Sequence, residues 1–321
     1  PTCMQGCPVS INIPTFVKNI ERGEFLEAAK VLKETSALPA VCGRVCPQEK
    51  QCESKCIHLK MGKPAVAIGY LERFAADYER ESGNISVPEV AEKNGIKIAV
   101  VGSGPAGLSF AGDMAKRGYD VTVFEALHEI GGVLKYGIPE FRLPNKIVDV
   151  EIEGLRKMGV KFLTNCIVGK TISYDDLHTD GFKGIFAASG AGLPNFMNIP
   201  GESLKGVYSA NEFLTRINLM KAYKEGSKTP IQHAKRVAVV GGGNVAMDAT
   251  RSAIRLGAKN VSVMYRRRKA DMTALMDEIE AAIAEGAEIL ELHAPQAIET
   301  NKKGQVTAMV ADPKIIGLIT G

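Results

Sequence analysis

Long apolar runs and a signal peptide are both missing from this sequence of 321 residues. A membrane-spanning helix needs roughly 18 to 20 apolar residues in a row, and no segment approaches that length. The net charge is only +4 and is spread along the chain, which argues against nucleic acids and membranes as partners. We therefore expect a soluble, cytoplasmic protein, and the hydrophobic content of 45% is enough for two or three domains.

Cysteine pairs with the CxxC spacing of most structural zinc sites are also absent. Six of the seven cysteines crowd near the N-terminus, as Cys3-x3-Cys7 and Cys42-x3-Cys46-x5-Cys52-x3-Cys56. Disulfides are unusual in a cytosolic protein. Thiolate-ligated iron–sulfur clusters fit best, because Cys7 and Cys46 each precede a proline, and zinc or unligated thiols are the alternatives. Cys166 stands alone in a strand-like stretch and is expected in a core.

The same phosphate-binding pattern occurs twice, at residues 98–125 and 237–266. In each copy an apolar, β-branched run ends in glycines, a helical pattern follows, and a second β-rich run closes the unit. Glycine permits the tight turn and close backbone approach, and the helix N-terminus favours a pyrophosphate. The residues expected at these turns are Gly102, Gly104, Pro105, Ala106 and Gly107 in the first copy, and Gly241, Gly242, Gly243, Asn244 and Val245 in the second.

The residue that ends each copy distinguishes the two nucleotides. Glu125 ends the first copy, where a carboxylate accepts hydrogen bonds from the ribose hydroxyls of FAD or NAD and repels a 2′-phosphate. Arg266 and Arg267 follow the second copy's last strand, and guanidinium groups form forked, charge-assisted bonds with phosphate. The second site is therefore predicted to bind NADP(H). A solvated charge run or a nucleic-acid patch is the alternative, but few aromatic residues accompany it.

Two nucleotide sites in one chain predict an oxidoreductase that moves hydride between two cofactors. Such transfer needs a nicotinamide stacked on a flavin with water excluded, so we expect no catalytic acid–base residue. No CxxC follows the second glycine turn, where Val245-Ala246-Met247-Asp248 stands. This absence disfavours the dithiol chemistry of thioredoxin-reductase-like enzymes.

Seven segments carry a resemblance across nearly the whole chain: CMQGCP, CGRVCPQEKQCESKC, AIGYLERFAADY, VGSGPAGL, GGVLKYGIPEFRLP, VVGGGNVAMDATRSAIRLGA and YRR. In order and spacing they resemble the glutamate synthase small-subunit family. Two further segments, GIPEFRLPNKIVDVEIEGLRKMGVK and GVYSANEFLTRINLMKAY, are most similar to the large subunit of the electron-bifurcating NADH-dependent ferredoxin:NADP oxidoreductase. The resemblance implies FAD, NADP(H), two [4Fe-4S] clusters, and a partner that is an electron-transfer subunit or the glutamate synthase large subunit.

The family pattern also implies the ligands of one cluster. These are Cys7, Cys46 and Cys52, with a carboxylate at Glu72 as the fourth ligand. From the sequence alone, Glu72 is better explained as an exposed helix residue, so the ligand role comes from the resemblance. Cys42 has no ligand role in the pattern and is expected to be a buried free thiol.

The second cluster would use Cys3 and Cys56 with two upstream cysteines that this sequence does not contain. We therefore expect this cluster to be incomplete in the present chain. The family's C-terminal Gly-Asp return, which directs a helix N-terminus at the flavin, is also absent, so the FAD domain is expected to be incomplete and to retain FAD poorly.

Flavin contacts in the first unit follow from the same resemblance. The glycines near residue 131 let backbone lie against a flat ring, and a strand at residues 186–191 ends in small residues that resemble a motif crossing beneath FAD. The positions that match the family's flavin contacts are Gly132, Val133, Arg142, Val168, Ser189 and Gly190.

The expected fold is α/β, with a helical iron–sulfur domain at residues 1–90, an FAD-binding Rossmann-like domain at 91–200 and an NADPH-binding one, C-terminally incomplete, at 201–321. Within the helical domain, Pro14 opens an amphipathic stretch that runs through Phe16 to Leu32. The expected function is an NADPH-dependent electron-transfer subunit. A self-sufficient NADPH reductase of a small acceptor and a cofactor-free docking fragment are the alternatives.

Overall fold

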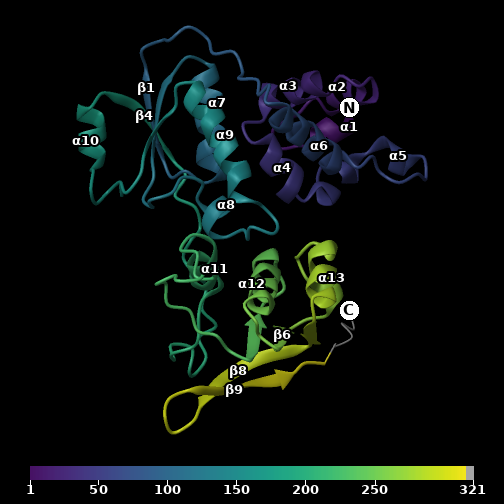
Figure 1. The fold of residues 1–321 in the computed structure, drawn as a ribbon, viewed down its shortest axis with the longest axis vertical. Helices are drawn as coiled ribbons and strands as arrows, with labels where there is room; N and C mark the ends of the chain where they lie inside the picture. Colours follow the sequence, from purple (N-terminus) through teal and green to yellow (C-terminus); the bar gives the residue numbers. More distant parts are fainter. Residues whose placement is uncertain (316–321) are drawn as a thin grey trace, which may run out of the picture. The chain divides into compact units, whose positions relative to one another are not determined.

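Two compact units make up the computed structural model, which describes residues 1–315 (Figure 1). The first unit consists of Pro1–Lys135 and Glu140–Gly190, and the second of Tyr136–Pro139 and the chain from Ala191 onward. Within the described part of the chain, every helix is too short or too polar to cross a membrane.

The N-terminal part of the first unit is helical. Its elements are α1 (Thr2–Gly6), α2 (Ile13–Glu21), α3 (Phe25–Thr35), α4 (Pro39–Val45), the 3-10 turns η1 (Gln48–Lys50) and η2 (Glu53–Lys55), α5 (Ile57–Lys60) and α6 (Ile68–Ser82). The expected single stretch from Pro14 to Leu32 is two helices, because the chain turns at Gly23 in a left-handed conformation (φ +78). Phe16 and Leu32 are nevertheless fully buried in one core, as the amphipathic pattern predicts.

A four-stranded parallel sheet with strand order β3-β2-β1-β4 forms the rest of the first unit. Its elements are β1 (Lys97–Val101), α7 (Pro105–Lys116), β2 (Asp120–Phe124), α8 (Val133–Tyr136), α9 (Asn145–Lys157), β3 (Lys161–Leu163), α10 (Tyr174–Thr179) and β4 (Phe182–Ala187). Helix α7 packs on β1 and β2, and α10 packs on β4. The parallel strands place their carboxyl ends, and the loops that follow them, at one edge of the sheet.

The second unit has a three-stranded parallel sheet, ordered β5-β6-β7, and a separate antiparallel pair of strands, β8 and β9. Its elements are α11 (Ala210–Asn218), β5 (Arg236–Val240), α12 (Asn244–Arg255), β6 (Asn260–Tyr265), η3 (Lys269–Asp271), α13 (Met276–Ala284), β7 (Ala287–Glu291), β8 (His293–Thr300) and β9 (Val306–Pro313). Helix α12 packs on all three parallel strands. Two parallel sheets in one chain confirm the α/β prediction.

The domain boundaries remain a prediction. The expected boundary near residue 90 lies in the segment between α6 and β1, and the helical part shares one compact unit with the first sheet. Contacts between α4 and α9 contribute to joining them.

Candidate functional site

The first glycine turn follows β1 and depends on its glycines for steric reasons. Gly102 has φ +104, and a Cβ there would lie 2.3 Å from the Ala188 carbonyl oxygen. A Cβ at Gly107 would lie 2.0 Å from the Gly102 carbonyl oxygen. Side chains at either position are therefore excluded by the backbone, as a tight strand–turn–helix connection requires.

Gly104 is glycine for a different reason. It precedes α7 with φ −69, a conformation open to any residue, and a Cβ added there meets no atom within 4 Å. Pro105 begins the helix, Ala106 follows it, and Gly104 has no side chain to cap the free N–H groups. The open space in front of these N–H groups fits a pyrophosphate at the helix N-terminus.

Glu125 lies directly after β2 and is held beside this turn. Its side chain is 6% exposed, and its Oε2 accepts hydrogen bonds from Ser103 N at 2.9 Å and Ser103 Oγ at 2.5 Å. Its Oε1 accepts from Leu127 N at 2.8 Å. The carboxylate is therefore at the predicted strand end. Ser103 is a site residue that the sequence reasoning missed, although its place between the two glycines of Gly102-Ser103-Gly104 was a signal.

Two further loops reach the same edge of the first sheet. Gly132 (φ +53) approaches the turn so closely that a Cβ on it would lie 2.7 Å from Gly104 Cα. Gly131 N donates to Ser103 Oγ at 2.9 Å. Ser189 follows the end of β4, where Ala187 pairs with Val101 at the end of β1.

The other predicted flavin contacts are distributed along the first unit. Gly190 has φ +73, Val133 opens α8 and is 37% exposed, and Arg142 is half-buried between α8 and α9. Val168 bridges to Ile172 and packs, half-buried, against the core beneath the sheet. Cys166 packs on the same core but lies after β3 and not within a strand, which corrects the expected strand position.

The second glycine turn follows β5 and has the same construction. Gly241 has φ +133, and Gly243 precedes α12 with a Cβ position whose nearest neighbour is Thr273 Oγ1 at 3.6 Å. Gly242 has a packing role, since a Cβ there would lie 2.7 Å from Tyr265 Cε2. The N-terminal end of α12 is fixed because the Asn244 side chain accepts from Leu275 N at 2.9 Å. Val245 is 47% exposed.

The basic run after β6 divides into two kinds of arginine. Arg268 is paired with Asp271, with Nη2–Oδ1 at 2.9 Å and Nε–Oδ2 at 3.0 Å. Arg266 and Arg267 are exposed, and their guanidinium groups make no hydrogen bond or ion pair with the residues described. Arg266 and Arg267 are therefore available for an external phosphate, whereas Arg268 already has a carboxylate partner.

All seven cysteines are free thiols. Cys52 and Cys56 are buried, and the others, including Cys42, are half-buried. The Cys42 thiol is hydrogen-bonded to Cys46, which lowers the pKa of Cys46 and raises the pKa of Cys42. Burial raises the pKa of Cys52 to about 12, and the nearby charges of Glu53, then Glu72 and Cys7, contribute to this shift. The charge of Cys46 likewise acts on Glu72, so each of the four proposed ligands interacts electrostatically with at least one other.

Glu72 is the unusual member of this group. Its side chain is 5% exposed on α6, and Oε1 has no hydrogen-bond partner. Burial, followed by the charges of Cys46 and Glu151, raises the pKa of Glu72 well above its ordinary value. An unpaired buried carboxyl oxygen is costly unless something binds it. The alternative of an exposed helix residue is therefore wrong, and the buried, unpartnered oxygen is compatible with a ligand role for Glu72.

The described cysteine side chains do not form a site for a single metal ion. Within residues 1–315, no three His, Cys, Asp or Glu side chains are arranged to hold a single metal ion. For the second predicted pair, Thr2 Oγ1 donates to the Lys55 carbonyl at 2.6 Å, which brings the neighbours of Cys3 and Cys56 together. The fit of these residues to iron–sulfur clusters therefore rests on the shared neighbourhood and the orphaned Glu72 oxygen.

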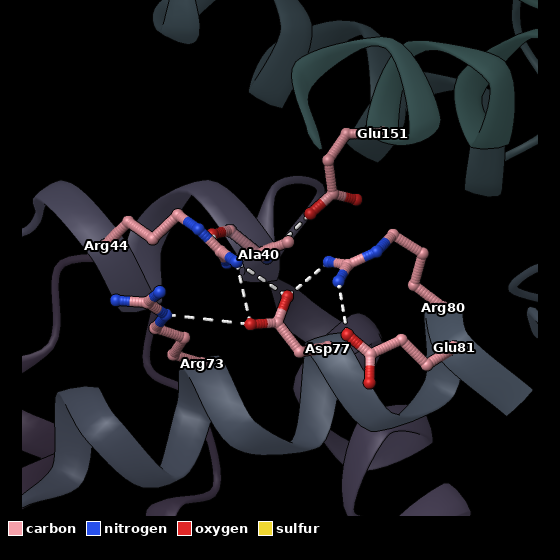
Figure 2. A network of polar contacts seen from close by, with 7 residues as sticks. All are labelled: Ala40, Arg44, Arg73, Asp77, Arg80, Glu81 and Glu151. Carbon is pink, nitrogen blue, oxygen red and sulfur yellow. Dashed lines mark hydrogen bonds and ion pairs between the residues drawn. The ribbon is translucent and has the colours of Figure 1, made fainter. Parts of the chain in front are cut away.

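A polar network surrounds α4, the helix that leads into Cys46 (Figure 2). Asp77 accepts from Arg44 Nη2 at 2.7 Å through both carboxylate oxygens, and it also pairs with Arg80 and, at 3.6 Å, with Arg73. The charges and hydrogen bonds of Arg44 and Arg80 hold the pKa of Asp77 below its usual range despite partial burial. Near the N-terminal end of α4, Glu151 Oε1 accepts from Ala40 N at 2.6 Å.

We expect Glu151 to make stability fall as pH rises through the weakly acidic range. Burial raises its pKa from 4.5 to about 7, against the opposing effects of the Ala40 hydrogen bond, Lys33 and Arg44, while Glu79 adds to the rise. Between these values the folded chain keeps a proton that the unfolded chain has lost, so up to about 3 kcal/mol of unfolding free energy is lost by pH 7 and then no more.

Urea denaturation from pH 4 to pH 8 measures this effect. Glu151→Gln lacks the titrating group, so its unfolding free energy relative to the unsubstituted chain should rise across the same window. Parallel pH profiles for the two proteins would contradict the expectation.

Family models match both the N-terminal helical part of the chain and the nucleotide-binding part that follows it. A model described as pyridine nucleotide-disulphide oxidoreductase matches residues 96–316, and one described as dihydropyrimidine dehydrogenase domain II, 4Fe-4S cluster, matches residues 1–84. The structure of Mycobacterium tuberculosis FprA in complex with NADPH has a TM-score of 0.57 at 19% identity, covering 71% of this chain and 66% of that one. At this identity the similarity shows the fold alone.

Curated relatives extend over nearly the whole chain. The glutamate synthase [NADPH] small chain of Escherichia coli K12 is 36% identical over 313 residues, which is 96% of this chain and 66% of the relative. The NADP(+)-dependent formate dehydrogenase subunit beta of Moorella thermoacetica is 37% identical over 330 residues, covering 96% and 45%. The NAD-dependent dihydropyrimidine dehydrogenase subunit PreT of Escherichia coli K12 is 33% identical over 327 residues, covering 98% and 76%.

The chain thus spans between 45% and 76% of the length of these three relatives. The expected resemblance to glutamate synthase small subunits is confirmed by these identities. With its N-terminal 4Fe-4S domain of the dihydropyrimidine dehydrogenase type, the chain belongs to the pyridine nucleotide-disulphide oxidoreductase family.

Proposed function

We propose that this chain is an electron-transfer subunit that passes electrons between NADP(H), FAD and a [4Fe-4S] cluster, and from there to a partner subunit. The observation that carries the proposal is the pair of phosphate-binding turns with opposite charge beside them. Glu125 is fixed beside the first turn, and Arg266 and Arg267 stand free after the strand next to the second. One chain therefore offers a site for a nucleotide without a 2′-phosphate and a site for one that has it.

FAD, when bound, would accept a hydride from a nicotinamide and release electrons singly. The residues of the first unit would bind FAD and orient it. The Gly104 turn leaves the helix N-terminus open to the pyrophosphate, Glu125 would contact the ribose from beside the turn, and Gly132 and Ser189 bring backbone to the same edge. The second turn and its two free arginines would select NADP(H) over NAD(H).

The iron–sulfur site completes the route. Cys7, Cys46, Cys52 and Glu72 would hold one cluster, and the orphaned Glu72 oxygen supports this set. The partner is proposed because several relatives are named as subunits or small chains of larger enzymes. A glutamate synthase large subunit is the specific candidate, and a cytoplasmic location is part of the same proposal.

A visible spectrum of the chain purified without oxygen tests the proposal. Flavin and iron–sulfur absorption should both be present after reconstitution, and NADPH should bleach the flavin band. Glycine at position 104 gives a sharper test. Because a Cβ there meets nothing within 4 Å, Gly104→Ala should fold normally, yet its methyl group occupies the space for the pyrophosphate and should weaken FAD binding about tenfold or more, roughly 1.4 kcal/mol.

Gly154→Ala is the matched control, since its Cβ also meets nothing but it lies on α9, away from the glycine turn. Fluorescence quenching on FAD titration measures the affinities, and thermal denaturation checks the fold. Equal FAD affinity in Gly104→Ala and Gly154→Ala would contradict the assignment of the pyrophosphate site to this turn.

A further inference from the structure

Helix α4 leads directly into Cys46, yet its own sequence does little to hold it in place. Seven residues are too few to form a stable helix alone. The residue before it, Leu38, has no side-chain oxygen to accept the free N–H groups of the first turn. The position of α4, and therefore of Cys46, depends on contacts made by other parts of the chain.

One set of contacts fixes α4 to α6. The Arg44–Asp77 pair joins the two helices, and their backbones meet so closely that a Cβ on Gly43 would lie 2.5 Å from Arg73 N. Arg73 directly follows Glu72 in the sequence. The contact at Gly43 therefore fixes the position of Glu72 along α6 relative to α4, the helix that leads into Cys46.

The other contact comes from the half of the unit that carries the first glycine turn. Glu151 lies on α9, 111 residues from Ala40, and its side chain is 8% exposed. Its carboxylate accepts Ala40 N at 2.6 Å, so α9 supplies the cap that Leu38 lacks (Figure 2). No side chain of α4 itself makes an equivalent bond.

We propose that Glu151 is a positioning residue for the iron–sulfur site, which holds the N-terminus of α4 from the flavin-binding half and so fixes Cys46 against Glu72 in the geometry that a cluster requires. The inference rests on the proposed function, since it assumes that Cys46 and Glu72 are ligands. Glu151 acts through α4 and is not itself a ligand. What matters is that its oxygen reaches Ala40 N, whether or not it carries a charge.

Two substitutions at Glu151 distinguish the position of its side-chain oxygen from the ionisation of its carboxyl group. Glu151→Gln keeps an oxygen at the same distance and removes the titratable carboxyl group, whereas Glu151→Asp keeps the carboxyl group and withdraws its oxygen by one methylene. In chains purified and reconstituted without oxygen, the EPR spectrum of the dithionite-reduced cluster reports ligand geometry. We expect Glu151→Gln to match the unsubstituted chain in line shape. Glu151→Asp should show shifted g values and lose iron to a chelator about fivefold faster, as expected for one lost hydrogen bond.

Met158→Ala is the matched control for a general loosening between α4 and α9. Met158 is the residue that follows α9. Together with Glu151 it lines a cavity of about 40 Å³, but it makes no hydrogen bond to α4. An unchanged spectrum in Met158→Ala, at a comparable loss of thermal stability, supports the positioning role.

Three results would overturn the inference: an unchanged spectrum in Glu151→Asp, a change in Glu151→Gln as large as that in Glu151→Asp, or the same change in Met158→Ala. An unsubstituted chain that binds no iron contradicts the proposed function itself, and the inference falls with it. A normal cluster in every variant contradicts the inference alone.

Discussion

Cys46→Ser and Cys52→Ser chains, prepared without oxygen, are expected to contain roughly one [4Fe-4S] cluster less iron than the unsubstituted chain, because serine replaces a thiolate ligand that the cluster needs. Cys42→Ser should keep all of its iron. Cys42 and Cys46 lie one helical turn apart and are hydrogen-bonded, so Cys42→Ser and Cys46→Ser alter one neighbourhood and differ in the proposed ligand role.

Iron and acid-labile sulfide analysis, with the visible spectrum, measures the loss. Cys42→Ser also removes the thiol that lowers the pKa of Cys46, so its spectrum is a check on cluster environment while its iron content tests ligation. If Cys42 proves as necessary for iron as Cys46, the ligand set is wrong. A site formed by Cys42, Cys46, Cys52 and Cys56, with zinc as a candidate metal, then becomes the better interpretation.

Replacing both free arginines with alanine is expected to weaken NADPH binding far more than NADH binding. Each lost charge-assisted hydrogen bond from Arg266 or Arg267 to the 2′-phosphate should cost on the order of 1.5–3 kcal/mol. NADH lacks that phosphate, so its affinity should change little. Isothermal titration of both nucleotides gives the two affinities.

Arg268→Ala is the control that the structure provides. Arg268 is the next residue, but its guanidinium is paired with Asp271, so its loss should affect NADPH binding much less. Equal losses for NADPH and NADH in Arg266→Ala/Arg267→Ala would contradict the NADP(H) assignment. A loss in Arg268→Ala as large as in the double variant would mean that the three arginines act only as diffuse positive charge.

The two nucleotide-binding turns were predictable from the sequence because their requirements are local. Gly102 needs a left-handed backbone (φ +104), and a Cβ on Gly107 would collide with the Gly102 carbonyl oxygen five residues earlier. Glu125 could be placed because a strand of known periodicity ends just before it. Short-range steric limits and strand geometry depend on neighbouring residues, so a sequence motif is enough to predict these turns.

The state of Glu72 could not be predicted in this way. Its helix reads as an ordinary polar segment, and the sequence alone favours an exposed side chain for it. On the same helix, α6, Arg73 contacts Gly43 of α4 and Gly69 contacts Gln48, so the surroundings of Glu72 are made by segments separated in the sequence. The same holds for Arg268, whose pairing with a carboxylate depends on the position of Asp271 after the turn.

By itself, then, the sequence determined the α/β class, both glycine turns, the opposite charges beside them and the crowding of cysteines, since each depends on residue type and spacing within one segment. Only the tertiary structure decided that Glu72 is buried with an unpartnered oxygen, that two of the three arginines are free, and that Glu151 holds α4 from 111 residues away. Burial and long-range hydrogen bonds arise when distant segments pack, and no local pattern encodes which of them will meet.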